Sequence, residues 1–187
     1  MNASDRTVLV LGDSLSAAYG IKPAQGWVAL LQKRLQDQGY GQRVVNASVS
    51  GETSSGGLQR LPRALQLHKP EVVVIELGAN DGLRGLPLAV TRENLTKMVT
   101  ASKRAGADVL LVGMQMPPNY GARYTSEFAA LFRDLAARNR IPLVPFLLES
   151  VALNDARMQA DGLHPNAAGQ PRLLDNVWPH LEPLLER

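Results

Sequence analysis

Short apolar runs alternate along the chain with segments whose apolar positions recur every three or four residues. The apolar runs extend over Thr7 to Leu11, Arg43 to Asn46, Glu71 to Leu77, Asp108 to Gly113 and, more weakly, Pro142 to Pro145. Strands that are buried on both faces form continuous apolar runs instead of alternating ones. These runs therefore predict five strands of a mainly parallel sheet.

The intervening segments carry apolar stripes that are typical of amphipathic helices. The stripes are Trp27, Leu30, Leu31 and Leu35; Leu95, Met98 and Val99; Phe128, Leu131, Phe132 and Leu135; and Leu174, Val177, Leu181, Leu184 and Leu185. A poorer helical pattern over Ser54 to His68 contains Pro62, which lacks a backbone donor. We expect a kink there, or a helix that starts late.

Strands that alternate with helices predict an α/β fold. We expect a three-layer α/β/α sandwich with a five-stranded parallel sheet in the flavodoxin-like order 2-1-3-4-5. The 187 residues are enough for one domain and few for two, so residues 1–187 are predicted to form a single domain. The strand-to-helix loops of such a sheet gather at one edge, and here they are 12–23, 47–53, 78–87 and 113–123.

Composition and charge exclude several function classes. The net charge is only +3, and the basic pairs Lys33-Arg34 and Lys103-Arg104 are isolated, so we expect no nucleic-acid partner. No apolar run approaches the ~20 residues of a membrane-spanning helix. The absence of cysteine excludes disulfides and thiolate nucleophiles. The first residues lack the apolar segment of a signal peptide, so we expect either a cytoplasmic protein or one whose leader has been removed.

Three of the predicted loops carry groups that can take part in chemistry. Ser14 directly follows the first apolar run, where it is either a nucleophile or a helix cap. Gly51 lets the backbone approach a ligand with its N–H exposed, although a tight turn would also use glycine. Asn80 brings two amide donors to the end of the third predicted strand, although Asn-Asp-Gly is also an ordinary turn signal.

His164 differs from the other two histidines, which lie at the end of a helical pattern (His68) or within one (His180). It follows Asp161 by three residues, with Gly162 between them. Such a loop lets the carboxylate accept a hydrogen bond from Nδ1–H, which leaves the other ring nitrogen as a base.

Together these residues supply every part of a serine hydrolase. Ser14 is the predicted nucleophile, His164 the general base and acid, and Asp161 the residue that orients the imidazole. The predicted oxyanion hole consists of the N–H groups of Ser14 and Gly51 and the side-chain amide of Asn80. The G-x-S-x-G elbow of α/β-hydrolases is absent, so a different scaffold is expected.

Four blocks in this order resemble the SGNH (GDSL-type) hydrolase family: residues 12–16, the Gly51 loop, residues 78–81 and residues 161–165. Residues 45–54, 76–85 and 118–124 resemble its bacterial thioesterase I/protease I/lysophospholipase L1 subgroup. The resemblance implies the same triad and oxyanion donors and a five-stranded three-layer fold. It also implies hydrolysis of aryl esters, lysophospholipids and acyl-CoA thioesters through an acyl-serine intermediate. Neither a metal nor another cofactor is implied.

The same resemblance implies a periplasmic, or otherwise secreted, protein, since subgroup members usually carry a signal peptide. We expect a monomer that acts on small acyl substrates. Apolar residues in the loops predict a groove for the acyl chain, lined by Leu83, Met116, Pro117, Tyr120 and Phe146. Alternatively, these side chains form a small core beneath long loops. The segment 78–87, with four glycine or proline positions, is expected to close over the substrate.

Three alternatives compete with this interpretation. An SGNH carbohydrate acetylesterase would need polar and aromatic walls, whereas aromatic residues make up only 5% of this chain. A metal-dependent phosphoesterase would use Asp13, Asp81, Asp161 and His164 as ligands, but it would leave Ser14 without a role. A non-catalytic binding module would have no need of a complete triad and oxyanion hole.

Overall fold

The computed structural model describes residues 6–185 and contains one parallel five-stranded sheet. The strands are β1 (Thr7–Gly12), β2 (Arg43–Asn46), β3 (Val72–Glu76), β4 (Asp108–Val112) and β5 (Leu143–Val144). Their order across the sheet is β2-β1-β3-β4-β5, and every pairing is parallel. The predicted fold class and strand order are therefore confirmed.

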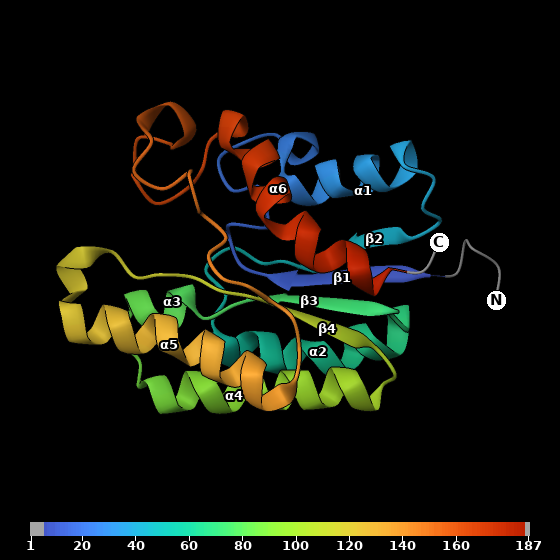
Figure 1. The fold of residues 1–187 in the computed structure, drawn as a ribbon, viewed down its shortest axis with the longest axis horizontal. Coiled ribbons are helices and arrows are strands. Elements are labelled where there is room, and N and C mark those ends of the chain that lie inside the picture. Colours follow the sequence, from blue (N-terminus) through green and yellow to red (C-terminus); the bar gives the residue numbers. More distant parts are fainter. Residues whose placement is uncertain (1–5, 186–187) are drawn as a thin grey trace.

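Helices cover both faces of this sheet and complete the three layers (Figure 1). They are α1 (Trp27–Asp37), α2 (Ser54–His68), α3 (Ala79–Leu83), α4 (Leu88–Arg104), α5 (Ala122–Asn139) and α6 (Gln170–Leu181). In Figure 1, α1 and α6 lie above the sheet, whereas α2, α4 and α5 lie below it. No helix among residues 6–185 combines the length and apolar character needed to cross a membrane.

The core forms where the predicted apolar stripes meet the sheet. The side chains of Val8 to Leu11 in β1 are 0% exposed, and so are those of Leu31 and Leu35 in α1. Met98 of α4 and Phe128 of α5 are equally buried against the opposite face. Burial of each such side chain contributes roughly 1.5–3 kcal/mol to folding, which fixes the two central strands, β1 and β3, firmly in place.

The structure departs from the sequence-based expectations at four elements. Helix α2 begins at Ser54, so the predicted late start was wrong; the Thr53 hydroxyl caps the helix by accepting a hydrogen bond from the Gly56 N–H. The helix continues through Pro62, whose side chain is exposed beside the buried Leu61. Strand β5 has only two residues, and the last predicted helix ends at Leu181, before a short 3₁₀ turn.

The fourth departure lies in segment 78–87, which was predicted to be a loop but contains the short helix α3. Its Asp81 side chain is 1% exposed and binds elements on both sides. Asp81 Oδ1 accepts from the Ser54 N–H (2.8 Å), and Oδ2 accepts from the hydroxyls of Ser54 (2.6 Å) and Thr91 (2.8 Å). A buried carboxylate needs such donors, and they anchor α3 between α2 and α4.

Candidate active site

Ser14 lies in a tight turn directly after β1, at the carboxyl edge of the sheet. The turn is closed by the N–H groups of Ser16 (3.2 Å) and Ala17 (3.0 Å), which donate to the Asp13 carbonyl. Position 12, the last of the strand, requires glycine because a Cβ there would lie 2.9 Å from Ser16 Oγ and 3.0 Å from Glu76 Oε1. Only glycine allows this close approach, so the local sequence Gly-Asp-Ser determines how the hydroxyl is presented.

His164 and Asp161 reach this turn from the other end of the chain. His164 Nε2 lies 2.9 Å from Ser14 Oγ, and Nδ1 lies 2.6 Å from Asp161 Oδ2. Asp161 Oδ1 also accepts from the N–H groups of Leu163 (2.9 Å) and His164 (3.0 Å), which holds the carboxylate against its own loop. The three predicted triad residues therefore lie in one line of hydrogen bonds, the arrangement that proton transfer from serine requires.

These hydrogen bonds also set the charge of Asp161. Donation from the His164 backbone N–H, from its imidazole and from the Leu163 N–H lowers the pKa of Asp161 to about 2. The carboxylate is therefore ionised throughout the neutral range. The Tyr19 ring packs on the imidazole with ring centroids 4.4 Å apart, which restricts how far His164 can rotate.

Gly51 and Asn80, the predicted oxyanion donors, are joined to each other through Glu52. Gly51 has a φ of +79°, a backbone conformation that glycine adopts without strain. The Asn80 side-chain amide donates to the Glu52 carbonyl (2.9 Å), and Arg84 donates to the Gly51 carbonyl (2.9 Å). These contacts bring residues of loop 47–53 and helix α3 to the same edge of the sheet as Ser14.

A partly buried ion pair holds the base of the Gly51 loop. Arg60 of α2 donates through Nε to Glu52 Oε2 (2.7 Å) and through Nη1 to the Ala47 carbonyl (2.8 Å). One guanidinium group thereby ties both ends of loop 47–53 to α2. The sequence analysis missed this support, because the contact depends on where the helix packs and not on local pattern.

The sequence analysis also missed a buried acid, Glu76, beneath the nucleophile. Glu76 and Asp13 are both 0% exposed, and their carboxyl groups contact each other. Burial raises the pKa of Asp13 to about 6, and burial together with the charge of Asp13 raises the pKa of Glu76 well above its usual range. The available signal was a glutamate at the end of an otherwise apolar strand.

An apolar pocket of about 390 Å³ opens beside Ser14 and His164. Four of the residues predicted to line an acyl groove do line it: Leu83, Met116, Pro117 and Phe146. Tyr120 is not among the lining residues; its hydroxyl donates to the Leu83 carbonyl (3.2 Å) and so supports the wall from outside.

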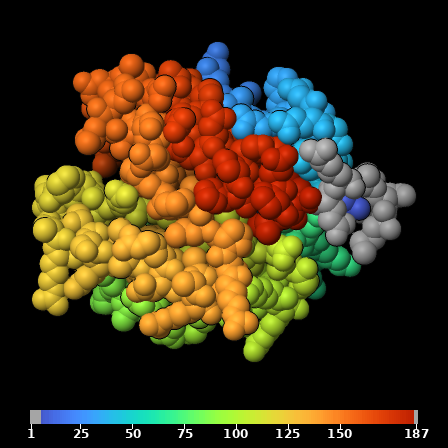
Figure 2. Space-filling model, in the orientation of Figure 1, coloured from blue at the N-terminus to red at the C-terminus, as the bar shows by residue number. Residues whose placement is uncertain are grey.

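The opposite wall was not predicted, since it comes from irregular backbone with no periodic pattern. It consists of Leu148, Ala152, Leu153, Met158 and Leu163. These residues belong to the lobe that precedes α6, drawn in orange in Figure 2. Leu153 is 94% exposed and has a φ of +64°, so an apolar side chain stands at the rim of the pocket.

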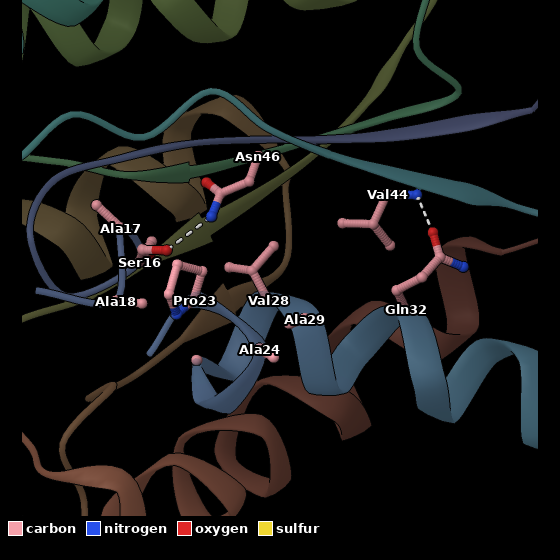
Figure 3. Close-up of a pocket in the computed structure, with 11 residues that line it drawn as sticks. Ser16, Ala17, Ala18, Pro23, Ala24, Val28, Ala29, Gln32, Val44 and Asn46 are labelled. Atoms are coloured by element: carbon pink, nitrogen blue, oxygen red, sulfur yellow. Dashed lines mark hydrogen bonds between the residues drawn. The ribbon is translucent and has the colours of Figure 1, made fainter. Parts of the chain in front are cut away.

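A second cavity of about 330 Å³ lies behind the Ser14 turn, between that turn, α1 and β2 (Figure 3). Small apolar side chains such as Ala17, Pro23 and Val28 line it. Its polar residues are already engaged: Asn46 donates to the Ser16 carbonyl (2.8 Å), and Gln32 accepts from the Val44 N–H (2.7 Å). None of its lining residues belongs to the predicted triad or oxyanion hole.

The four proposed ligands of a metal-dependent phosphoesterase do not form a ligand set. Within residues 6–185 no group of three or more His, Asp or Glu side chains is placed to hold a metal ion. Asp81 is committed to Ser54 and Thr91, and Asp161 to His164. This alternative is therefore left without a site.

Comparison with known proteins agrees with this geometry. Residues 10–172 match the model of the GDSL-like lipase/acylhydrolase family. The chain is 57% identical to Esterase TesA of Pseudomonas aeruginosa over 98% of this chain and 91% of that protein. It is 45% identical to an arylesterase of Vibrio mimicus, covering 91% of this chain and 85% of that protein. It is also 44% identical to thioesterase 1/protease 1/lysophospholipase L1 of Escherichia coli K12, covering 98% and 86%.

A solved structure described as that of TesA superimposes on this fold with a TM-score of 0.94 and 58% identity. The superposition covers 96% of this chain and all of that one. High identity, a matching fold and an intact set of blocks thus agree across nearly the whole chain. The chain therefore belongs to the GDSL-like lipase/acylhydrolase family and is an ester hydrolase.

Proposed function

We propose that this enzyme hydrolyses acyl esters and thioesters with Ser14, His164 and Asp161 as its catalytic triad. The observation that carries the proposal is the continuous line of hydrogen bonds from Asp161 through His164 to Ser14, which ends at the mouth of an apolar pocket. Nucleophile, base and orienting acid are within hydrogen-bond reach of one another without further movement.

In the first step His164 Nε2 takes the proton of the Ser14 hydroxyl while Oγ attacks the substrate carbonyl carbon. The carbonyl electron pair moves onto oxygen, and the N–H groups of Ser14 and Gly51 and the Asn80 amide stabilise the resulting negative charge. The tetrahedral intermediate then collapses, and His164 gives its proton to the departing alcohol or thiol. Ionised Asp161 stabilises the imidazolium between these two transfers.

The acyl-serine that remains is released by water. His164 takes a proton from the water as its oxygen attacks the acyl carbon, and it returns that proton to Ser14 Oγ as the C–O bond breaks. The products are a free carboxylic acid and the regenerated serine. No metal or organic cofactor enters either half of the reaction.

We further propose that the pocket beside Ser14 binds the acyl chain. Its walls include Met114 and Met116, whose unbranched side chains adapt to chains of different length. The relatives named as an esterase, an arylesterase and a thioesterase/lysophospholipase support aryl esters, lysophospholipids and acyl-CoA as substrates. We also propose that the chain acts as a single-domain monomer in the periplasm, in line with the family resemblance.

The test is a hydrolysis panel with the purified protein: p-nitrophenyl esters with acyl chains from two to sixteen carbons, an acyl-CoA and a lysophospholipid. We expect activity that depends on Ser14 and is highest at medium or long chains. Met116→Trp, which fills the pocket, should shift the optimum to shorter chains. Leu67→Trp is the control, because Leu67 lies exposed on α2 and does not line the pocket.

The outcomes separate the competing functions. A preference for acetyl esters alone would keep the mechanism but assign the enzyme to the carbohydrate acetylesterase alternative. An unchanged chain-length optimum in Met116→Trp would remove the pocket from the proposal. Activity that survives in Ser14→Ala would overturn the mechanism itself.

A further inference from the structure

Two carboxyl groups that take no part in the triad lie buried beneath the nucleophile turn. Glu76 is the last residue of β3 and pairs in register with Gly12, so its side chain meets that of Asp13 at the end of β1. Both side chains are 0% exposed, and their carboxyl groups lie close enough for the pKa of each to depend on the other. Two buried acids in contact are unusual enough to require an explanation.

The hydrogen bonds around this pair leave one oxygen without a donor. Glu76 Oε1 accepts from the Ser16 hydroxyl (2.6 Å), and Asp13 Oδ1 accepts from the Leu15 N–H (3.0 Å). Trp27 Nε1 donates to Ser16 Oγ (3.2 Å) and so orients that hydroxyl toward Glu76. Among residues 6–185, no N–H or O–H group donates to Glu76 Oε2.

A proton on Glu76 resolves this arrangement. A protonated carboxyl group donates where an ionised one can only accept, so one proton turns two repelling acceptors into a hydrogen-bonded pair. The charges that face the pair agree with this. The charge of Asp13 opposes ionisation of Glu76, whereas hydrogen bonding by Glu76 and the charge of His164 both favour ionisation of Asp13. Glu76 Oε2, the oxygen without a donor, is therefore the one placed to carry a proton shared by this pair.

The pair is connected to the predicted oxyanion hole through Asn80. One N–H of the Asn80 amide is used by the Glu52 carbonyl at 2.9 Å. The same nitrogen lies 3.4 Å from Asp13 Oδ2, a long contact that binds an N–H only weakly. If Glu76 did not donate to the Asp13 carboxylate, Oδ2 would attract this second N–H more strongly and keep it from the substrate.

We propose that Glu76 is a positioning residue: protonated, it donates to the Asp13 carboxylate and thereby leaves one N–H of Asn80 available to the substrate oxyanion. This inference rests on the proposed role of Asn80 in the oxyanion hole. It explains why β3 ends in a glutamate, although the residues before it in this buried strand are aliphatic. It also gives Asp13 a role in holding the turn that presents Ser14.

The central experiment compares two substitutions at position 76. Glu76→Gln keeps a donor for Asp13 and an acceptor for Ser16, whereas Glu76→Met has similar length and keeps neither. We expect Glu76→Gln to stay within about threefold of the wild-type kcat, and Glu76→Met to lose more than tenfold in kcat with little change in KM. Ser102→Ala, which removes a buried hydrogen bond to the Met98 carbonyl in α4, should leave kcat unchanged.

A double-substitution cycle asks whether Glu76 acts through Asn80. We expect Glu76→Met to lower kcat much less in an Asn80→Ala background than in the wild-type one. An equal loss in both backgrounds would overturn the inference, and so would a Glu76→Gln enzyme as impaired as Glu76→Met, because a charged carboxylate would then be required. If Asn80→Ala alone kept the wild-type kcat, the oxyanion role proposed for Asn80 would fail, and this inference with it.

Infrared spectroscopy tests the proton itself, without relying on turnover. The difference spectrum between the wild type and Glu76→Gln at pH 7 should contain the C=O stretch of a protonated carboxylic acid. Only carboxylate bands in that difference would overturn the inference. This readout also decides the matter if Glu76→Met does not fold.

Discussion

His164 Nε2 lies 2.9 Å from Ser14 Oγ, although 150 positions separate the two residues in the chain. The contact joins the turn after the first strand to the loop before the last helix. Both segments are held by backbone hydrogen bonds of their own, such as that from the Gln159 N–H to the His164 carbonyl (2.8 Å). The two ends of the chain thus meet at a preformed site, and several consequences can be measured.

Substitutions in the triad should have unequal effects. We expect Ser14→Ala and His164→Ala to lower kcat by roughly 10⁴–10⁶, since nucleophile and base act as a unit. Asp161→Asn should lose less, about 10³–10⁴, because the imidazole stays near Ser14 although its tautomer is no longer enforced. Steady-state kinetics with a p-nitrophenyl ester would measure this, with thermal unfolding to show that each variant folds. A wild-type rate in Asp161→Asn would remove that residue from the triad.

Loss of the Asn80 amide should affect catalysis and not binding. We expect Asn80→Ala to lower kcat by about 10²–10³ with little change in KM, because an oxyanion donor acts mainly in the transition state. Asn94→Ala is the matched control, since it too removes an asparagine hydrogen bond, from Asn94 Nδ2 to Ser54 Oγ (3.0 Å). Equal losses of kcat in the two variants would indicate a purely structural role for Asn80.

Gly51 and Gly39 allow a second matched comparison, because both have a φ of +79°. An added Cβ meets no atom within 4 Å at Gly39, and at Gly51 only Arg84 at 3.8 Å. Each alanine substitution should therefore cost about 1 kcal/mol of folding stability through backbone strain alone. Only Gly51→Ala should also lower kcat, because its N–H would turn away from the oxyanion. Urea unfolding and kinetics on both variants would show whether the two effects separate.

The stability of the enzyme should depend on the proton at Glu76. Burial and the charge of Asp13 raise the pKa of Glu76 well above its usual value of 4.5, so the folded state binds a proton that the unfolded chain releases. The stabilisation from this proton is complete below about pH 4.5 and is lost as pH rises through the folded-state pKa. Glutamine does not titrate. Above pH 4.5 the free energy of unfolding of the wild type should therefore fall relative to that of Glu76→Gln. The difference should change by at most about 1.4 kcal/mol per pH unit.

Urea unfolding of both proteins at several pH values between 4 and 8 would measure this difference. Glu76→Gln keeps the hydrogen bonds to Asp13 and Ser16, so the comparison isolates the ionisation. A constant difference across this range would mean that Glu76 ionises in the folded protein as it does in the unfolded chain.

The sequence by itself determined the elements and the catalytic residue types. Continuous apolar runs identify β1 and β3 because strands buried on both faces must be apolar throughout, and stripes such as Phe128, Leu131 and Phe132 identify the helices. The parallel order then follows from the alternation of strands and helices. The four blocks around Ser14, Gly51, Asn80 and His164 could be recognised because each consists of adjacent residues.

Only the tertiary structure decided what lies between these blocks. The pocket wall opposite Met116, which includes Leu153 and Leu163, comes from irregular backbone. Such backbone leaves no periodic signal in the sequence. Helix α3 forms where a turn was expected, because Asp81 finds buried donors on two other helices. The contact of Asp13 with Glu76 depends on the register of β1 and β3, which are separated in the chain by α1, β2 and α2. Such long-range contacts are set by how the elements pack, and local propensity carries no information about them.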